Sequence, residues 1–310
     1  MKQLLYRLRN YYLNMKAFIT ILLLLTMMST TAQRTDKKLL RKVETLLQGF
    51  NGQAGVYLHD LKKNKSITIN ADTIFATASM VKIPILIGVM DKIEKGELSY
   101  DQQLVYKDSL LYAGEDILGS FKKDEKISLS KVLMLMLTTS DNTASLWLQS
   151  LAGTGTRINQ LLDSMGFKYT RVNSRTPGRE ANRTQYGWGQ TTPAEMALMM
   201  EKIVRKEVVN KKASERMLRL LGRNFWDENA ISQLPPDVFI ASKNGAVNAA
   251  RSEVLYVNSP GSRYIFCICT QNNKDQSWTP GNEAWTLTRK LSLLLWKHFN
   301  PRSNWQPLVN

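Results

Sequence analysis

The order of strand-like and helix-like segments constrains the fold of this chain more than any other feature of its sequence. From residue 78 to about 203 the sequence indicates helical segments and loops, with no convincing pair of strands. Runs of β-branched and aromatic residues, typical of strands, stand on both sides of that region, at 54–60, 66–70, 238–243, 253–258 and 263–271. This order predicts an α/β (α+β) fold in which an antiparallel sheet, built from N- and C-terminal strands, carries an inserted all-helical subdomain.

Helices should also flank the sheet. Apolar residues at helical spacing predict one helix at 35–50 and another at 283–299. The inserted helical subdomain is expected at roughly 79–221. With 310 residues, of which 43% are hydrophobic, the chain can bury a large core.

The N-terminal segment is typical of a signal peptide. An apolar run at 17–28 leads into small residues at 29–32, and the residues before it include four cations, Lys2, Arg7, Arg9 and Lys16. The run is shorter than the roughly 20 residues that span a bilayer as a helix. We therefore predict a signal peptide at 1–32, a catalytic domain at 33–310, a periplasmic or secreted location and no stable membrane insertion after cleavage. An uncleaved N-terminal anchor is the alternative.

The net charge and the two cysteines limit the kinds of partner and metal site that we expect. Lys and Arg number 42 against 26 Asp and Glu, a formal net charge of +16. The cations are scattered, which favours a basic solvated surface, with attraction to anionic cell-envelope polymers as the alternative. No basic helix supports a nucleic-acid partner. Cys267 and Cys269 lie two apart on a predicted strand, a poor geometry for a disulfide, and they are too few for a zinc site. We expect no metal and no cofactor.

One long segment has few apolar residues and several Gly and Pro. A structureless loop as long as 173–190 is uncommon inside a compact domain and is often functional. It is followed by Thr192-Pro193-Ala194-Glu195, which has the Thr, Pro and Glu of a capping-box helix start.

The chemistry is carried first by Ser79-Met80-Val81-Lys82. Residues three apart share a helix face, so the Lys82 amine can lie beside the Ser79 hydroxyl and take its proton. This requires a lowered lysine pKa, and the apolar run at 83–89 indicates burial. The pattern also occurs at Ser120-x-x-Lys123 and Ser128-x-x-Lys131, where the surrounding sequence is highly charged, so we interpret those copies as chance.

Two further motifs follow in order. Ser140-Asp141-Asn142 lies between two predicted helices, and Lys243-Asn244-Gly245 ends a predicted strand. Alone, the first could be a helix N-cap and the second a hairpin turn. All three motifs in sequence are much harder to obtain by accident.

Together the motifs resemble the signature of class A β-lactamases and penicillin-binding proteins. The resemblance covers roughly 37–299, and the intervals, 61 residues from Ser79 to Ser140 and 164 from Ser79 to Lys243, are similar to the class A branch. It implies that Ser79 is acylated, that Lys82 activates it and that Ser140 passes a proton to the leaving nitrogen. The substrate-binding residues would be Asn142, Lys243, Gly245, Ala246 and Arg251.

The resemblance also implies finer roles. The oxyanion hole would be the backbone amides of Ser79 and Ala246. Asn244 stands where the family has Thr or Ser, which weakens the expected recognition of a substrate carboxylate. Arg251 would supply a second carboxylate contact, or else be a surface arginine.

The main departure is the missing Glu-x-x-Leu-Asn pattern, whose Glu drives deacylation in class A β-lactamases. Glu180 is the only acid between Asn173 and Ala194, and it comes four or five positions late. Either it replaces the missing catalytic Glu, or it forms a salt bridge to one of the neighbouring arginines, Arg175, Arg179 or Arg183.

Three functions are consistent with these residues. The first is an exported serine hydrolase that hydrolyses β-lactams, and the second is a peptidoglycan peptidase or another amide or ester hydrolase. The third is a β-lactam or muropeptide binder that deacylates slowly. In each case the partner is a small molecule, a β-lactam or a peptidoglycan peptide, and a monomer is expected.

Overall fold

The computed structural model describes residues 1, 11–12, 15–16, 34–114 and 116–307. The chain divides into two units, Met1–Arg34 and Thr35–Asn310, with the short strand β1 (Arg34–Thr35) at their junction. The predicted cleavage site after Ala32 lies outside the described residues. The second unit holds all the motifs.

An antiparallel sheet forms the centre of the second unit. Its strands lie in the order β3 (Lys65–Ile69), β2 (Gln53–Asp60), β11 (Arg263–Gln271), β10 (Ala250–Asn258) and β9 (Phe239–Val247), and each pair of neighbours is antiparallel. Strands from the two ends of the sequence meet where β2 pairs with β11. The predicted sheet is therefore confirmed.

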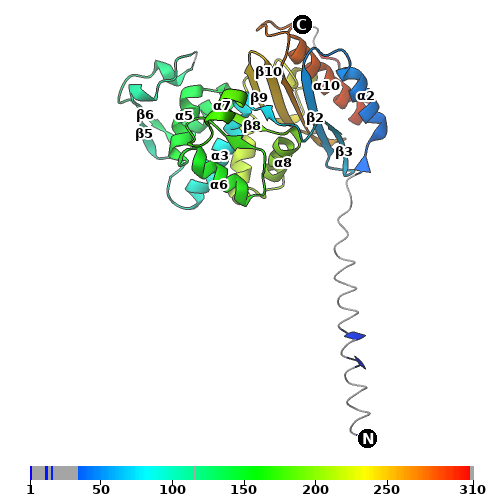
Figure 1. Cartoon of the computed structure of the whole chain (residues 1–310), viewed down its shortest axis with the longest axis horizontal. Coiled ribbons are helices and arrows are strands. Elements are labelled where there is room, and N and C mark those ends of the chain that lie inside the picture. The colour runs from blue at the N-terminus through cyan, green and yellow to red at the C-terminus, as the bar shows by residue number, and fades with distance from the viewer. Residues whose placement is uncertain (2–10, 13–14, 17–33, 115, 308–310) are drawn as a thin grey trace. The chain divides into compact units, whose positions relative to one another are not determined.

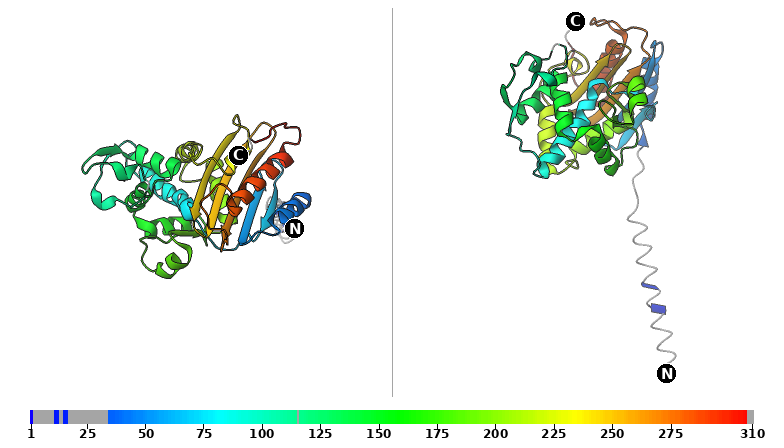
Figure 2. Two further views of the ribbon diagram at one scale, coloured as in Figure 1. Left: turned by 90° about the horizontal axis from the view of Figure 1, so that it is seen from above. Right: turned by 60° about the vertical axis from the view of Figure 1, so that its left-hand side comes forward.

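Helices cover both faces of the sheet. α2 (Lys37–Leu47) and α10 (Glu283–Phe299) pack on one face, where Leu39 and Leu291 join the strand residues in a buried core (Figures 1 and 2). α8 (Pro193–Val204) packs on the opposite face. The amphipathic patterns that predicted the two flanking helices are explained by this burial.

The inserted part is organised around a buried helix. α3 (Lys82–Glu94) is fully enclosed from Lys82 to Asp91, which explains its almost continuous apolar sequence. Its neighbours are α5 (Asn142–Leu151), α6 (Thr154–Ser164) and α9 (Lys211–Leu221). α4 (Leu129–Met134) also precedes the loop predicted at 173–190.

The prediction of an all-helical insert is wrong in detail. A small sheet joins β4 (Phe75–Ala76), β8 (Gly189–Thr191) and β7 (Arg171–Val172), and β5 (Gln103–Val105) pairs with β6 (Lys126–Ser128). These strands have two or three residues each, too few to produce an alternating pattern in the sequence.

The predicted loop at 173–190 also contains a helix, α7 (Glu180–Tyr186). No residue of α7 is buried, so it shows none of the apolar periodicity by which helices are predicted. The helix start after the loop is confirmed, because the Thr192 side chain accepts a hydrogen bond from the Glu195 amide at 3.2 Å. The Glu195 carboxylate accepts hydrogen bonds from the backbone amides of Lys168, Tyr169 and Thr170, which precede the loop.

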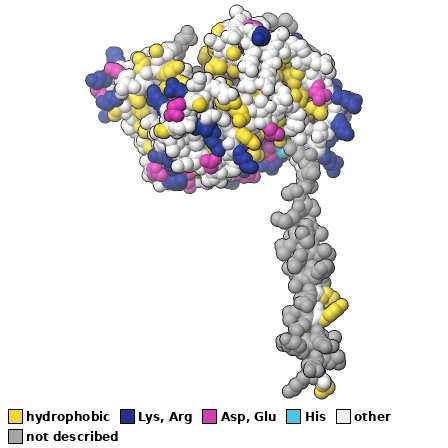
Figure 3. All heavy atoms as spheres, viewed as in Figure 1, with side chains coloured by type: hydrophobic (Ala, Val, Ile, Leu, Met, Phe, Trp, Pro, Cys, Tyr) yellow, Lys and Arg dark blue, Asp and Glu magenta, His cyan; other side chains and the backbone are white. Residues whose placement is uncertain are grey.

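The two cysteines are buried, and charges of both signs lie on the surface (Figure 3). Cys267 and Cys269 are free and buried, with their sulfur atoms 3.7 Å apart. On the face seen in Figure 3, Lys and Arg are scattered among acidic side chains. Within the described residues, no helix is long and apolar enough to cross a membrane.

Candidate active site

Ser79 lies in a single 3-10 turn, η1 (Ala78–Val81), that leads directly into α3. The turn is held tightly against β9, at Gly245. A Cβ atom at Gly245 would lie 2.5 Å from the Thr77 carbonyl oxygen and 2.7 Å from the Ser79 amide nitrogen. Only glycine therefore allows β9 to approach so closely, and this brings the backbone at Gly245 and Ala246 beside the Ser79 amide.

The Lys82 amine is the centre of the site. It is fully buried, and it donates hydrogen bonds to Ser79 Oγ at 3.2 Å, Ser140 Oγ at 3.0 Å and Asn142 Oδ1 at 2.9 Å. It also contacts the Ser140 carbonyl oxygen. The two hydroxyls belong to residues that are only partly buried. A shielded amine thus contacts the hydroxyl groups of two partly exposed residues.

The environment of Lys82 favours its neutral form. Burial lowers the Lys82 pKa well below its usual 10.5, and the positive charge of Lys243 lowers it further. The negative charges of Asp116 and Asp141 oppose this shift. A lysine with a lowered pKa can accept the proton of a neighbouring alcohol.

The Ser140 motif combines a helix cap with two side chains that contact Lys82. Ser140 has a left-handed backbone, with φ of 62°, directly after the π-helical turn η4 (Leu135–Thr139). Asp141 is the N-cap of α5, and its carboxylate accepts from the amides of Ala144 at 2.7 Å and Leu118 at 2.8 Å. The N-cap alternative is therefore correct for Asp141, while the residues on either side of it bind Lys82.

Lys243 lies within β9 and not in a hairpin turn, which excludes the alternative for that motif. Its buried amine donates to the main-chain oxygen of Asn244 at 2.9 Å and to Asn244 Oδ1 at 3.1 Å. Burial lowers the Lys243 pKa from 10.5 to about 7, and the charge of Glu253 opposes that shift. Asn244, the departure from the family pattern, thus holds the lysine that should recognise a carboxylate.

The comparisons with known proteins agree with this geometry. A family model described as the beta-lactamase enzyme family matches residues 38–299. The chain belongs to this family. Beta-lactamase VEB-1 of Pseudomonas aeruginosa is 24% identical over 259 residues, which cover 80% of this chain and 86% of VEB-1. The protein is a class A β-lactamase-like serine hydrolase.

Solved structures show the same fold. PBP-A superposes with a TM-score of 0.77 at 23% identity, covering 87% of this chain and 98% of PBP-A. A representative class A beta-lactamase from Bacteroides cellulosilyticus DSM 14838 superposes with a TM-score of 0.75 at 19% identity, covering 86% and 99%.

Arg251 is paired with Ala246 across β9 and β10 of this β-lactamase-like site, but its side chain is held by other partners. Its buried guanidinium donates to the carbonyl oxygens of Asn248, Ala250 and Ser277 and lies 4.5 Å from the ring centre of Trp278. It is also not the surface arginine of the alternative. The predicted carboxylate contact gains no support from this position, since the guanidinium binds main-chain carbonyls at the turn of the β9–β10 hairpin and at Ser277.

Glu180 is likewise separate from the Lys82 network. It is exposed in the first turn of α7, and its carboxylate accepts a hydrogen bond from the Gly178 amide at 3.1 Å. Within the described residues, no ion pair joins it to Arg175, Arg179 or Arg183. A carboxylate at a helix N-terminus is stabilised by the free amides there, so its position has a local structural cause.

The position where the family Glu is expected is also occupied differently. Four residues before Glu180, Thr176 is buried and its hydroxyl donates to the Ser174 carbonyl oxygen at 2.9 Å. A Cβ atom at Gly155, in α6, would lie 1.8 Å from the same hydroxyl. Thr176 therefore packs against α6.

The loop interior contains residues that sequence reasoning missed. The Arg179 guanidinium donates to Asn173 Oδ1 and to Gln190 Oε1, each at 2.7 Å. Burial lowers the Arg179 pKa, and the nearby charge of Arg171 lowers it further. No local pattern announces this arrangement, because it depends on how the loop folds back onto β8.

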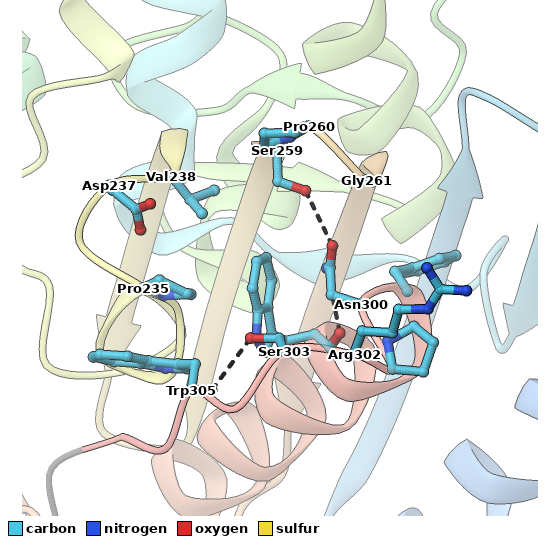
Figure 4. Close-up of a pocket in the computed structure, with 13 residues that line it drawn as sticks. Pro235, Asp237, Val238, Ser259, Pro260, Gly261, Asn300, Arg302, Ser303 and Trp305 are labelled. Carbon is cyan, nitrogen blue, oxygen red and sulfur yellow. Dashed lines mark hydrogen bonds between the residues drawn. The ribbon is translucent and has the colours of Figure 1, made fainter.

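A separate cavity of about 810 Å³ lies where the chain's C-terminal segment crosses the end of the sheet. Figure 4 shows its walls, including Ser259, whose hydroxyl donates to Asn300 Oδ1 at 3.2 Å, and Trp305 near Pro235. None of the predicted site residues lines this cavity.

Proposed function

We propose that the protein is an exported serine hydrolase whose Ser79 forms an acyl-enzyme, most readily with β-lactams. The observation that carries the proposal is the buried Lys82 amine, 3.2 Å from Ser79 Oγ and 3.0 Å from Ser140 Oγ. A neutral amine in this position accepts the Ser79 proton as the hydroxyl oxygen attacks a carbonyl carbon.

The remaining residues complete one acyl transfer. As the bond from Ser79 Oγ to the carbonyl carbon forms, the oxyanion is stabilised by the amides of Ser79 and Ala246. The carbon–nitrogen bond then breaks. Ser140 donates its proton to the departing nitrogen and recovers one from Lys82. Asn142, bonded to the Lys82 amine at 2.9 Å, keeps that amine in place.

Lys243 gives the substrate its orientation. Its charged form, in strand β9 beside the turn of Ser79, would attract a substrate carboxylate. The charged Lys243 amine has three N–H donors, and Asn244 accepts two hydrogen bonds from it, so a carboxylate finds one donor left unless it displaces Asn244. We therefore propose weaker carboxylate recognition than Thr or Ser would give at this position.

The second candidate function is a peptidoglycan peptidase, or another amide or ester hydrolase. The position of Glu180 favours it, because an exposed carboxylate bound to the Gly178 amide supplies no base for hydrolysing the acyl-enzyme. A third possibility, a binder that stays acylated, follows from the same observation. All three share acylation of Ser79 and differ in how fast the acyl group leaves.

Intact-protein mass spectrometry tests the proposal. Incubation with benzylpenicillin should add one penicilloyl group, which peptide mapping should place on Ser79, and Ser79→Ala should remove it. The decay of the adduct separates the candidates: loss within seconds supports a β-lactamase, and persistence for hours supports the peptidase or the binder. An adduct mapped to Ser120 or Ser128 would refute the assignment of the nucleophile.

Export is tested separately. We propose cleavage after Ala32, a mature N-terminus at Gln33, a periplasmic or secreted location and a monomeric state. N-terminal sequencing of the protein from a periplasmic fraction would establish the first three, and a full-length cytosolic product would contradict them. Light scattering would establish the fourth.

A further inference from the structure

The three-residue segment 224–226, between α9 and the C-terminal strands, connects the chain before Ser140 to the chain before Lys243. The Phe225 amide donates to the Thr138 carbonyl oxygen at 3.0 Å, and the Trp226 indole Nε1 donates to the Thr139 carbonyl oxygen at 2.9 Å. Thr138 and Thr139 immediately precede Ser140. The segment is therefore fixed to the backbone that carries the proposed proton donor.

The same segment is fixed to strand β9. The Asn224 side chain donates to Ser242 Oγ at 2.9 Å and accepts from the Trp226 amide at 3.3 Å. Ser242 immediately precedes Lys243. Residues 224–226 thus bridge the chain in front of Ser140 and the chain in front of Lys243.

Two large aromatic rings are exposed on this bridge. Phe225 is 63% exposed and Trp226 is 39% exposed, and the rings meet edge to face with their centres 5.3 Å apart. Hydrogen bonds hold the Phe225 backbone and the Trp226 indole, while much of the surface of both rings stays in water. Rigid, exposed aromatic surface beside reactive groups is characteristic of ligand contact, since it needs little ordering when a ligand binds.

We propose that Phe225 and Trp226 form an aromatic shelf that binds an apolar or aromatic group on the leaving-group side of the substrate. The inference rests on the proposed role of Ser140. A nitrogen that receives a proton from Ser140 Oγ must come within hydrogen-bond distance of it. Substituents on that nitrogen, or on the substrate ring that contains it, then extend over the backbone at 138–140. Phe225 and Trp226 are hydrogen-bonded to this backbone.

Two cephalosporins with the same acylamino group test the shelf, one with a methyl group at position 3 and one with a styryl group. That position lies on the leaving-group side, so only the styryl compound would reach the rings. The measured quantity is the ratio of acylation rates, styryl over methyl, in each protein. Taking ratios within one compound pair cancels differences in general activity among the variants.

Phe225→Ala removes one ring and leaves the backbone hydrogen bond in place. It should lower the styryl-to-methyl ratio by about two- to tenfold, the value of one ring contact, and leave the methyl rate unchanged. Trp226→Phe, which keeps a ring and loses the indole hydrogen bond, should retain most of the ratio. Tyr169→Ala, which removes an aromatic ring that is 44% exposed near β7, is the matched control and should change neither rate.

The contrary results are distinct. A Phe225→Ala ratio equal to that of the wild type would overturn the shelf. An equal loss on both compounds would also overturn it, because the segment would then only position Ser140. If neither compound acylates the wild type, the proposed function fails, and the shelf is tested by equilibrium binding of the same pair to Ser79→Ala. Equal affinity of both compounds for Ser79→Ala and for its Phe225→Ala derivative would overturn it there.

Discussion

The Lys82 network and the loop at 173–190 both adjoin the turn that carries Ser79, yet they are built in opposite ways. In the network, one buried amine is bound to the side chains of three motif residues. The loop reaches the turn at Gly189, where a Cβ atom would lie 2.7 Å from Thr77 Oγ1. Inside the loop, Arg179 binds the neutral side-chain amides of Asn173 and Gln190. The only acidic residue of the loop, Glu180, is exposed.

The difference separates two halves of one reaction. Acylation needs a nucleophile, a base and a proton donor, and the network holds the residues proposed for these three roles within hydrogen-bond distance. Release of the acyl group needs an activated water, and the family places the carboxylate for this in the loop. In this chain the loop has Thr176 packed on α6 and Glu180 facing solvent. The two regions are therefore expected to respond differently to mutation.

The largest effect should come from Lys82. Lys82→Met removes the proposed base and leaves an apolar side chain of similar length in the buried space. Acylation of Ser79 by a fluorescent penicillin should slow by about 10²–10⁴-fold, the range of general-base assistance. Time-resolved labelling on a denaturing gel measures this.

The control for that variant is another Ser-x-x-Lys copy. Lys131 is exposed, so Lys131→Met should label at the wild-type rate. Labelling of Lys82→Met that falls by less than about tenfold would contradict the assignment of the base.

Lys243 should have the next largest effect, and only on charged substrates. Lys243→Ala should slow the reaction of a carboxylated β-lactam by about tenfold to over a hundredfold, the value of a hydrogen bond to a charged group. A neutral ester should be much less affected. Equal losses on both substrates would contradict a role in carboxylate recognition.

The same lysine predicts a pH dependence. Burial lowers the Lys243 pKa to about 7, and the amine is charged below that value. The wild-type kcat/KM for a carboxylated substrate should therefore decline as the pH rises through about 7, relative to the kcat/KM for the neutral ester. Dividing the two profiles removes the contribution of Lys82, which must be neutral for either substrate. A flat quotient between pH 6 and 9 would contradict the prediction.

Arg179 should affect stability more than chemistry. Arg179→Ala leaves Asn173 and Gln190 without their charged donor, and both are buried. Losing such bonds should reduce the free energy of unfolding by about 1–3 kcal/mol, which urea denaturation would show. Arg183→Ala, an exposed position in the same loop, should cost less than about 0.5 kcal/mol. Equal stability of the two variants would mean that Arg179 does not organise the loop.

Much of the fold could be predicted because its signals are long. The strands β9, β10 and β11 have nine residues each, and the buried helix α3 has thirteen. The short strands of the insert and the helix α7 were missed, since two or three residues, or a helix with no buried face, leave no periodic pattern. Local periodicity reports burial, and these elements are fixed by tertiary contacts.

The site divides in the same way. The residues that meet at Lys82 belong to motifs whose order and spacing could be recognised. The positions of Arg251 and Glu180 could not be read from spacing, because each depends on which partner the folded chain brings near. Arg251 meets three carbonyl oxygens and two tryptophan rings, and Glu180 meets the amide of Gly178. The Asn224–Trp226 bridge has no sequence signal at all.

The smallest effect is expected from Glu180, and it decides between the two interpretations of the loop. If Glu180 were the base that activates water, Glu180→Gln would slow deacylation by about 10²–10⁴-fold and leave acylation intact. The structure shows an exposed carboxylate that accepts from the Gly178 amide, a contact that glutamine can also make through its carbonyl oxygen. We therefore expect deacylation to change by less than about twofold and stability by less than about 0.5 kcal/mol. The decay of the benzylpenicillin adduct on Ser79, followed by mass spectrometry in wild type and variant, measures the first quantity. A long-lived adduct found only in Glu180→Gln would restore Glu180 as the deacylating base, and would require the loop to bring it toward Ser79 once the acyl group is in place.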